Sequence, residues 1–315
     1  LKDFANQGFF ICIASKNEKQ DVEKLLDQRK DFLIKKEDFS LICASWEEKS
    51  SMIEKIADFL NIHVDSILFI DDNIGEILSV LAKYPDIHVI QASENPQITN
   101  TILANYPGLM KLSIQKEDQL RSEDIKENQK RQKIKQTLSK EAYLKSLQIT
   151  LQYQCNPLES VVRISELANK TNQFIFSYKR YSIQEIKERM QRKEMIVIAV
   201  NLQDRLSDSG LIGVCVIKKA TDFLILEECF ISCRALGRGI EDAIVLGSIS
   251  IAQDLFGLKK VKILFQKGER NTPAEKFLNQ YAKEYINQEQ EMNYILPKDV
   301  IKIEIEGIKN ERKSD

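Results

Sequence analysis

The sequence predicts an α/β protein in which a doubly wound unit with a parallel sheet is followed by an α+β unit with a mainly antiparallel sheet. Three observations support this. Strand and helix patterns alternate over the first part of the chain, a densely charged stretch follows, and three strand patterns then stand in a row. A length of 315 residues suits two domains. We therefore predict a first domain at 1–112, a helical connector at 113–146 and a second domain at 147–315.

In the first unit, short apolar runs are the strand candidates, and apolar residues at three- and four-residue spacing mark the helices. Parallel strands need a crossover connection, so this alternation favours a parallel sheet. The active site of such a sheet lies at the carboxyl ends of its strands. The predicted strands are 8–14, 67–70 and 87–90, and the predicted helices are 18–28, 50–60 and 74–83.

The second unit opens with alternating apolar and polar residues from 147 to 153, which is the pattern of a half-buried strand. Its element order, β-α-α-β-β-β-α-β-α-β, differs from that of the first unit and indicates hairpins. The remaining predicted helices are 161–170, 182–191, 239–255 and 273–281, and the remaining predicted strands are 195–200, 211–217, 223–231, 261–265 and 300–305.

Composition excludes several classes of protein. Lys and Arg together number 46 against 47 Asp and Glu, and this balance argues against a globally basic nucleic-acid binder. No apolar run approaches the roughly 18 residues of a membrane-spanning helix, and the first residues lack signal-peptide anatomy. With two histidines and no CxxC pair, a zinc site or a histidine triad has few residues to be built from. We expect a cytoplasmic protein with reduced cysteines and with neither membrane nor nucleic-acid partners.

Polar side chains follow two predicted strands of the first unit. Ser15 and Asn17 come directly after the first strand, and Asp71 and Asp72 follow the strand at 67–70. Adjacent carboxylates there suit Mg²⁺, and a hydroxyl at a helix start suits a phosphate oxygen. Lys49 opens the helix between them and can neutralise phosphate charge. Helix capping by the acids and by Ser15, and an ordinary surface role for Lys49, are the alternatives.

Together Ser15, Lys49 and the Asp71-Asp72 pair resemble the second, third and fourth motifs of the haloacid dehalogenase (HAD) phosphohydrolase superfamily, in order and spacing. This resemblance implies a Rossmann-like three-layer domain. The superfamily's nucleophilic aspartate, in an Asp-x-Asp-x-Thr motif on the first strand, is expected before Leu1 and occurs nowhere in the sequence. Because the chain begins with Leu, we expect an N-terminally incomplete piece of a longer protein. Its phosphatase half should be inactive as the chain stands.

A glycine-containing loop joins a strand to a helix in the second unit. It reads Cys233-Arg234-Ala-Leu-Gly237-Arg238-Gly239 and contains Arg-x-x-Gly-x-Gly. Glycines let backbone N–H groups converge on an anion such as the phosphate of a pantetheine arm, on CoA or on a carrier protein. We expect Arg234, Gly237, Arg238 and Gly239 to hold this phosphate. A structural turn is the alternative. The order of elements resembles the Gcn5-related N-acyltransferase (GNAT) fold.

Cys233 stands beside this loop and is a candidate nucleophile for acyl transfer. The arginines and the helix start would favour its thiolate. A buried structural cysteine is the competing interpretation.

Further segments resemble the FkbH-like proteins, which join these two halves: Lys-Thr-Asn-Gln-Phe at 170–174, Arg-Tyr-Ser at 180–182 and the run from Cys233 to Glu241. The resemblance implies an enzyme that takes a phosphoglyceryl group from 1,3-bisphosphoglycerate, releases phosphate and loads glyceryl as a thioester on an acyl carrier protein, in polyketide or related biosynthesis. Ile175 stands where the family commonly has Asn. The candidate binding residues for the phosphorylated glycerate substrate are Asn17, Lys170, Asn172, Gln173 and Arg180. For the last four, helix capping and surface solvation are the alternatives.

Two other functions remain open. One is a CoA-dependent N-acyltransferase beside an inert HAD-like half, and the other is a non-catalytic docking module for a carrier protein.

Overall fold

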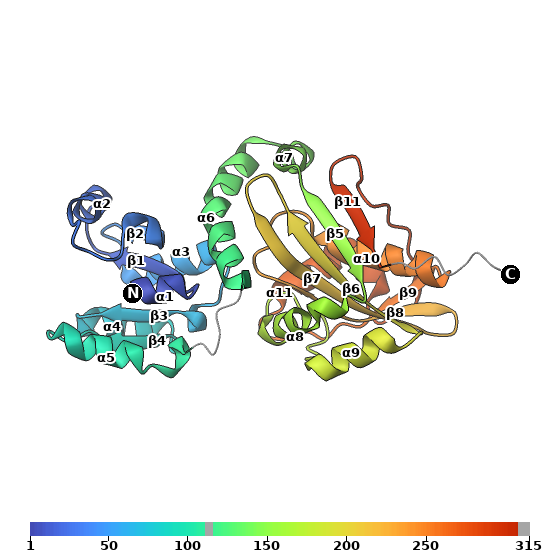
Figure 1. The fold of residues 1–315 in the computed structure, drawn as a ribbon, viewed down its shortest axis with the longest axis horizontal. Helices are drawn as coiled ribbons and strands as arrows, with labels where there is room; N and C mark the ends of the chain where they lie inside the picture. Colours follow the sequence, from blue (N-terminus) through green and yellow to red (C-terminus); the bar gives the residue numbers. More distant parts are fainter. Residues whose placement is uncertain (111–115, 308–315) are drawn as a thin grey trace. The chain divides into compact units, whose positions relative to one another are not determined.

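The computed structural model describes residues 1–110 and 116–307, which form two compact units, Leu1–Lys126 and Glu127–Asp315 (Figure 1). The division lies inside helix α6 (Lys116–Thr137), within the predicted connector. Residues 113–115 of that connector lie outside the described residues. Among the helices that are described, none is both long and apolar enough to cross a membrane. α7 (Lys140–Leu147) follows α6.

The strands of the first unit form two parallel pairs. β1 (Ile11–Ser15) pairs with β2 (Phe39–Ala44), and β3 (Leu68–Asp71) pairs with β4 (His88–Gln91). The prediction of parallel strands is confirmed, but the described strands form two two-stranded sheets instead of one. β2 was not predicted, because its apolar residues directly follow a charged run and none of its side chains is fully buried.

Helix α3 (Lys49–Leu60) packs on both strand pairs of this unit. Ile53 contacts the cluster of Phe69 and Ile77, whereas Ile56 and Leu60 pack in a second cluster with residues of β1 and β2. α3 therefore places its first residue, Lys49, near the strand ends. The other helices of the unit are α1 (Lys2–Asn6), α2 (Lys19–Gln28), α4 (Ile74–Lys83) and α5 (Pro96–Ala104).

The second unit is built on a seven-stranded sheet in the order β10-β9-β8-β7-β6-β5-β11. The neighbours from β5 to β8 are antiparallel, whereas β8 with β9 and β11 with β5 are parallel. This confirms a mixed α/β protein whose second sheet is mainly antiparallel. The strands are β5 (Thr150–Cys155), β6 (Met195–Gln203), β7 (Asp208–Lys219), β8 (Phe223–Ile231), β9 (Lys260–Ile263), β10 (Gln290–Glu291) and β11 (Lys302–Glu306).

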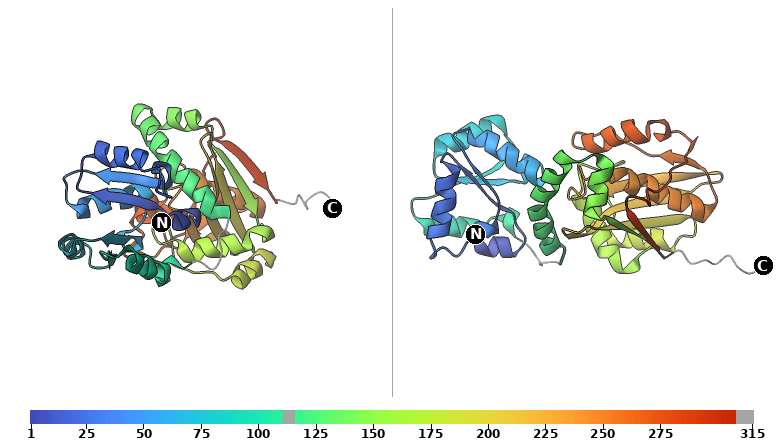
Figure 2. Two further views of the ribbon diagram at one scale, coloured as in Figure 1. Left: turned by 60° about the vertical axis from the view of Figure 1, so that its left-hand side comes forward. Right: turned by 90° about the horizontal axis from the view of Figure 1, so that it is seen from above.

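Helices cover both faces of this sheet, as the views in Figures 1 and 2 show. Along β6, Val197 packs with the cluster that includes α8 and α9, while Ile196 and Ile198 pack with the cluster of α10 and α11. A strand that is buried on both faces reads as a continuous apolar run, as β6 does. The helices are α8 (Val161–Lys170), α9 (Ile183–Gln191), α10 (Glu241–Phe256) and α11 (Thr272–Tyr281).

Candidate functional site

The first unit holds a buried ion pair at the carboxyl end of β3. The Lys49 ammonium, from the first residue of α3, donates to Asp71 Oδ2, and the side chains of Lys49 and Asp71 are 15% and 5% exposed. The Asn73 N–H donates to Asp71 Oδ1 at 3.0 Å, and the Asn73 side chain caps α4. The structure thus brings together two of the predicted catalytic residues, Lys49 and Asp71.

The other predicted residues of this unit form separate local contacts. Asn17 Nδ2 donates to Ser15 Oγ at 2.9 Å, at the end of β1. Asp72 is exposed. Lys16, to which we assigned no role, pairs with Glu76 at the start of α4 at 2.6 Å. Contacts between Ser15 and the Lys49–Asp71 pair stay a prediction.

Mg²⁺ has few oxygen ligands at this place. Both oxygens of Asp71 already accept a hydrogen bond, one of them from an ammonium. Within residues 1–110 and 116–307, no group of three or more His, Cys, Asp or Glu side chains could hold a metal ion. The side chains present therefore do not make an Mg²⁺ site by themselves, and no step below depends on the metal.

We expect this chain to bind Mg²⁺ weakly and the Lys49→Ala variant to bind it about tenfold more tightly. The reason is that the ammonium neutralises the carboxylate that would be the main ligand. Isothermal titration calorimetry measures both affinities, with Lys55→Ala, an exposed lysine of the same helix, as the control. Weaker binding by Lys49→Ala than by the native chain would contradict this account.

The second unit has its anion-binding candidate where β8 leads through a loop into α10. Gly237 and Gly239 both have φ of +78°, a conformation that glycine adopts without strain. The Gly237 N–H donates to Glu241 Oε1 at 2.6 Å. A Cβ on Gly237 would meet no atom within 4 Å, so open space lies beside the Gly237 Cα atom. A carboxylate of the chain thus already occupies a donor that we predicted for phosphate.

Two lysines beside this loop had no role in the sequence-based prediction. The Lys135 ammonium donates to the Gly237 carbonyl oxygen. The Lys140 Cε atom lies 3.4 Å from where a Cβ on Gly239 would stand, and Lys140 Nζ is 3.7 Å from Asp242. Both come from the charged connector, where nothing in the local sequence separates them from ordinary surface lysines. They add positive charge to the loop.

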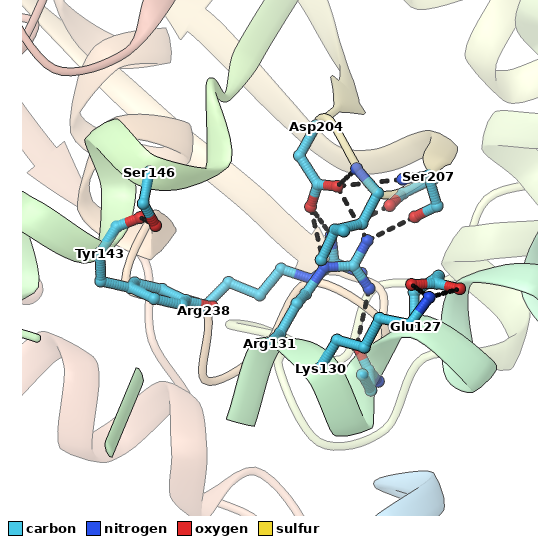
Figure 3. A network of polar contacts seen from close by, with 11 residues as sticks. Glu127, Lys130, Arg131, Tyr143, Ser146, Asp204, Ser207 and Arg238 are labelled. Carbon is cyan, nitrogen blue, oxygen red and sulfur yellow. Dashed lines mark hydrogen bonds and ion pairs between the residues drawn. The ribbon is translucent and has the colours of Figure 1, made fainter. Parts of the chain in front are cut away.

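The arginine side chains of the loop are buried. Arg234 and Arg238 are each 4% exposed. Arg238 donates to Asp204 Oδ2 at 3.3 Å and to Ser209 Oγ at 3.1 Å, and Figure 3 shows Arg238 and Arg131 converging on Asp204. This geometry favours a structural role for the Arg238 guanidinium over the predicted phosphate contact. For Arg234, whose Nε donates to Ser232 Oγ at 3.5 Å, and for the backbone N–H groups of the loop, the phosphate contact stays a prediction.

Cys233 is a half-buried thiol two residues beyond the end of β8. The other cysteines of the unit lie inside strands, where burial raises the pKa of Cys155 to about 11 and that of Cys229 well above its ordinary value. Burial likewise raises the pKa of Cys12, in β1, to about 12. These thiols stay protonated at neutral pH. The role of Cys233 as nucleophile stays a prediction.

The segment after α8 carries the remaining substrate-binding candidates. Arg180 donates to the carbonyl oxygens of Ala168 and Thr171 and to Asn172 Oδ1. Its guanidinium therefore stabilises the C-terminal end of α8. Lys170 is exposed and Gln173 half-buried. Asn172 lines a pocket of about 310 Å³ together with Tyr178 and residues 266–270. The contacts of Arg180 therefore favour a structural role for it, whereas substrate contacts of Lys170, Asn172 and Gln173 stay predictions.

No family model and no curated protein matches this chain. Among solved structures it is similar to the N-terminal part of a Bacteroides fragilis protein containing a phosphatase domain complexed with Mg, with 28% identity over 36% of this chain and 30% of that chain and a TM-score of 0.34. It is also similar to the ribosomal-protein-S18-alanine N-acetyltransferase of Escherichia coli, with 9% identity over 42% of this chain and 77% of that chain and a TM-score of 0.33. For a Thermoplasma acidophilum N-acetyltransferase in complex with coenzyme A, the identity is 14%, the coverage 42% and 87%, and the TM-score 0.32. The chain thus spans less than a third of the phosphatase-domain protein, and its similarities are to a phosphatase domain and to N-acetyltransferases.

Proposed function

We propose that this chain is part of a two-unit acyltransferase of the FkbH type, which moves the glyceryl group of 1,3-bisphosphoglycerate to the thiol of an acyl carrier protein. The observation that carries the proposal is the loop between β8 and α10. The Gly237 N–H donates to a carboxylate, open space lies beside the Gly237 Cα atom, and two lysines lie next to the loop. Such a loop suits the phosphate of a phosphopantetheine arm.

The transfer itself needs a nucleophile and no further energy source. Cys233 Sγ attacks the acyl carbon of the acyl phosphate, so that a C–S bond forms, the C–O bond to phosphate breaks, and the thiol proton passes to solvent. The carrier thiol then attacks this thioester, forming a second C–S bond and releasing the Cys233 sulfur. The second exchange is nearly isoenergetic because one thioester replaces another.

The first unit would act on the remaining phosphate. The Lys49–Asp71 pair supports a phosphate-handling crevice there, since an ammonium held by a carboxylate at a strand end can also neutralise phosphate. Hydrolysis through a phosphoaspartyl enzyme needs a nucleophilic aspartate, and the sequence has no Asp-x-Asp-x-Thr motif. The product expected from this chain alone is therefore the phosphoglyceryl thioester with its second phosphate retained.

The test is incubation of the chain with holo acyl carrier protein and enzymatically generated 1,3-bisphosphoglycerate, followed by intact-protein mass spectrometry. We expect the carrier to gain one phosphoglyceryl group, with apo carrier protein unmodified. A carrier that stays unmodified would contradict acyl transfer, and a dephosphorylated glyceryl product would contradict the inactive phosphatase. Acetyl transfer from acetyl-CoA to an amine would instead favour an N-acyltransferase.

Cys233→Ala is expected to lower the loading rate at least a hundredfold, because the relay loses its nucleophile, and to abolish the acyl adduct on the enzyme. Cys155→Ala is the matched control, since that thiol lies in a strand of the same unit with a raised pKa. If Cys233→Ala loads the carrier at the native rate, transfer proceeds directly within a ternary complex.

A further inference from the structure

The carboxyl ends of β8 and β9 part from each other, and another segment of the chain fills the opening. The two strands pair in parallel from Phe223 with Lys260 to Leu226 with Ile263. Beyond Leu226 the β9 side of β8 is instead bonded to residues 174–176. Ile175 forms an antiparallel bridge with Phe230, and the Ile231 N–H donates to the Phe174 carbonyl at 3.0 Å.

The inserted segment is bonded on its other side as well. The Gln266 N–H, just beyond β9, donates to the Phe176 carbonyl at 2.8 Å. Asn271, which is fully buried, donates to the Ile175 carbonyl at 3.0 Å and to the Gln266 carbonyl at 2.9 Å. Residues 174–176 are at most 1% exposed. They therefore complete the sheet where β8 and β9 diverge.

A buried carboxylate holds the continuation of this segment. Glu228, on β8 and 0% exposed, accepts the N–H groups of Phe176 at 2.7 Å, Ser177 at 3.0 Å and Lys179 at 2.8 Å, together with the Ser177 hydroxyl at 2.8 Å. These N–H groups converge because Tyr178 adopts φ of +58°, a strained conformation for a bulky residue. Burial raises the pKa of Glu228, and the donors oppose that rise.

The opening that is filled in this way is the crevice where a ligand of the second unit would be expected. In sheets with parallel neighbours, ligands bind outside the carboxyl ends of the strands. The same end of β8 continues into Cys233 and the glycine loop. A pantetheine arm whose phosphate lies on that loop meets the inserted segment instead of an open crevice.

We propose that residues 174–179, here called the strap, close the crevice between β8 and β9, that Glu228 is the latch of the strap, and that the strap must withdraw before a pantetheine arm can enter. That a pantetheine arm is the ligand rests on the proposed function. That the strap closes the crevice does not, and separate experiments test the two claims.

Hydrogen exchange of the full chain, followed by mass spectrometry with peptide resolution, measures the strap directly. Glu228→Gln should speed exchange at Phe176, Ser177 and Lys179 by about 10- to 100-fold. The reason is that it replaces a charged carboxylate, which has two acceptor oxygens, by a neutral amide, which has one acceptor oxygen. Asp222→Asn is the control: Asp222 directly precedes β8, and its exposed carboxylate pairs with Lys260 at 3.7 Å and not with a strap residue. Its exchange should equal that of the native chain. Equal exchange in Glu228→Gln would overturn the latch.

CoA is the probe for entry into the crevice. A ligand that binds only the open state binds in proportion to the population of that state. Glu228→Gln should therefore bind CoA at least about tenfold more tightly than the native chain or Asp222→Asn does. Bound CoA should also speed exchange of the strap. CoA binding with equal affinity to all three proteins, or without change in strap exchange, would overturn gating, as would no CoA binding by Glu228→Gln.

A second variant tests the strap in case Glu228→Gln does not fold. Asn271→Asp replaces the amide donor to the Ile175 and Gln266 carbonyls by an acceptor oxygen, which these carbonyls repel, and should show the same two effects. Native exchange and native CoA affinity in Asn271→Asp would count against the strap. These experiments measure hydrogen exchange and CoA affinity and do not measure loading of the carrier protein. A negative result for the strap is therefore distinguishable from a negative result for the proposed transfer.

Discussion

Replacing Asp204 by Asn is expected to lower the free energy of unfolding of the second unit by about 3 to 5 kcal/mol, as breaking a buried ion pair does. The Asp204 side chain is 0% exposed, and it accepts from Arg131 at 2.8 and 3.0 Å and from Arg238 at 3.3 Å. The Arg131 and Arg238 side chains are only 3% and 4% exposed. The amide would leave two buried guanidinium groups without this carboxylate.

Urea denaturation measures this change, with circular dichroism following the whole chain. Trp46 is the single tryptophan and lies in the first unit, so its fluorescence reports that unit separately. The urea midpoint followed by Trp46 fluorescence should shift less than the midpoint followed by ellipticity. Asp222→Asn is the control, because Asp222 forms an exposed ion pair with Lys260 at 3.7 Å, worth at most about 1 kcal/mol. A loss below about 1 kcal/mol for Asp204→Asn would contradict the structural role of the network.

Replacing Glu241 by Ala is expected to raise the affinity of the glycine loop for an anion by about 10- to 100-fold. The Glu241 carboxylate accepts the Gly237 N–H at 2.6 Å and so competes with any phosphate for that donor. A hydrogen bond to a charged group is worth about 1.5 to 3 kcal/mol, which corresponds to that change in affinity.

Inorganic pyrophosphate is the probe, because it can reach the loop without entering the crevice behind the strap. Titration calorimetry at low salt should show tighter binding by Glu241→Ala and weaker binding by Lys140→Met, which removes a positive charge beside Gly239. Lys145→Met should match the native chain, since Lys145 is an exposed residue of the same helix paired with Glu141. Unchanged binding in Glu241→Ala would show that anions do not use the Gly237 N–H.

Local sequence predicted most elements but missed helices α1 and α5 and strands β2 and β10. The apolar runs at β3 and β6 and the helical spacing of α3 and α4 were recognised from sequence. β2 was missed because its neighbour β1, more than twenty residues away, supplies its hydrogen bonds. β10 has two exposed residues, and no pattern of that length identifies a strand.

For the candidate site residues, too, the sequence predicted some contacts and missed others. Lys49 and Asp71 were predicted to work together from their places at a helix start and a strand end, and they do form an ion pair. Arg238 was assigned to phosphate from its place in the loop. Its side chain instead points to Asp204, thirty-four residues earlier, because a buried guanidinium needs a charged partner.

The sequence by itself determined the α/β class, the order of most elements and the positions that require glycine, since hydrophobic periodicity and backbone sterics are local properties. Only the tertiary structure decided which polar groups meet: Glu241 with the Gly237 N–H, Glu228 with the strap, and Lys140 beside Gly239. These contacts join different elements, in part far apart in the chain. They follow from the need of buried or crowded polar groups for partners, which the packing of the whole unit provides.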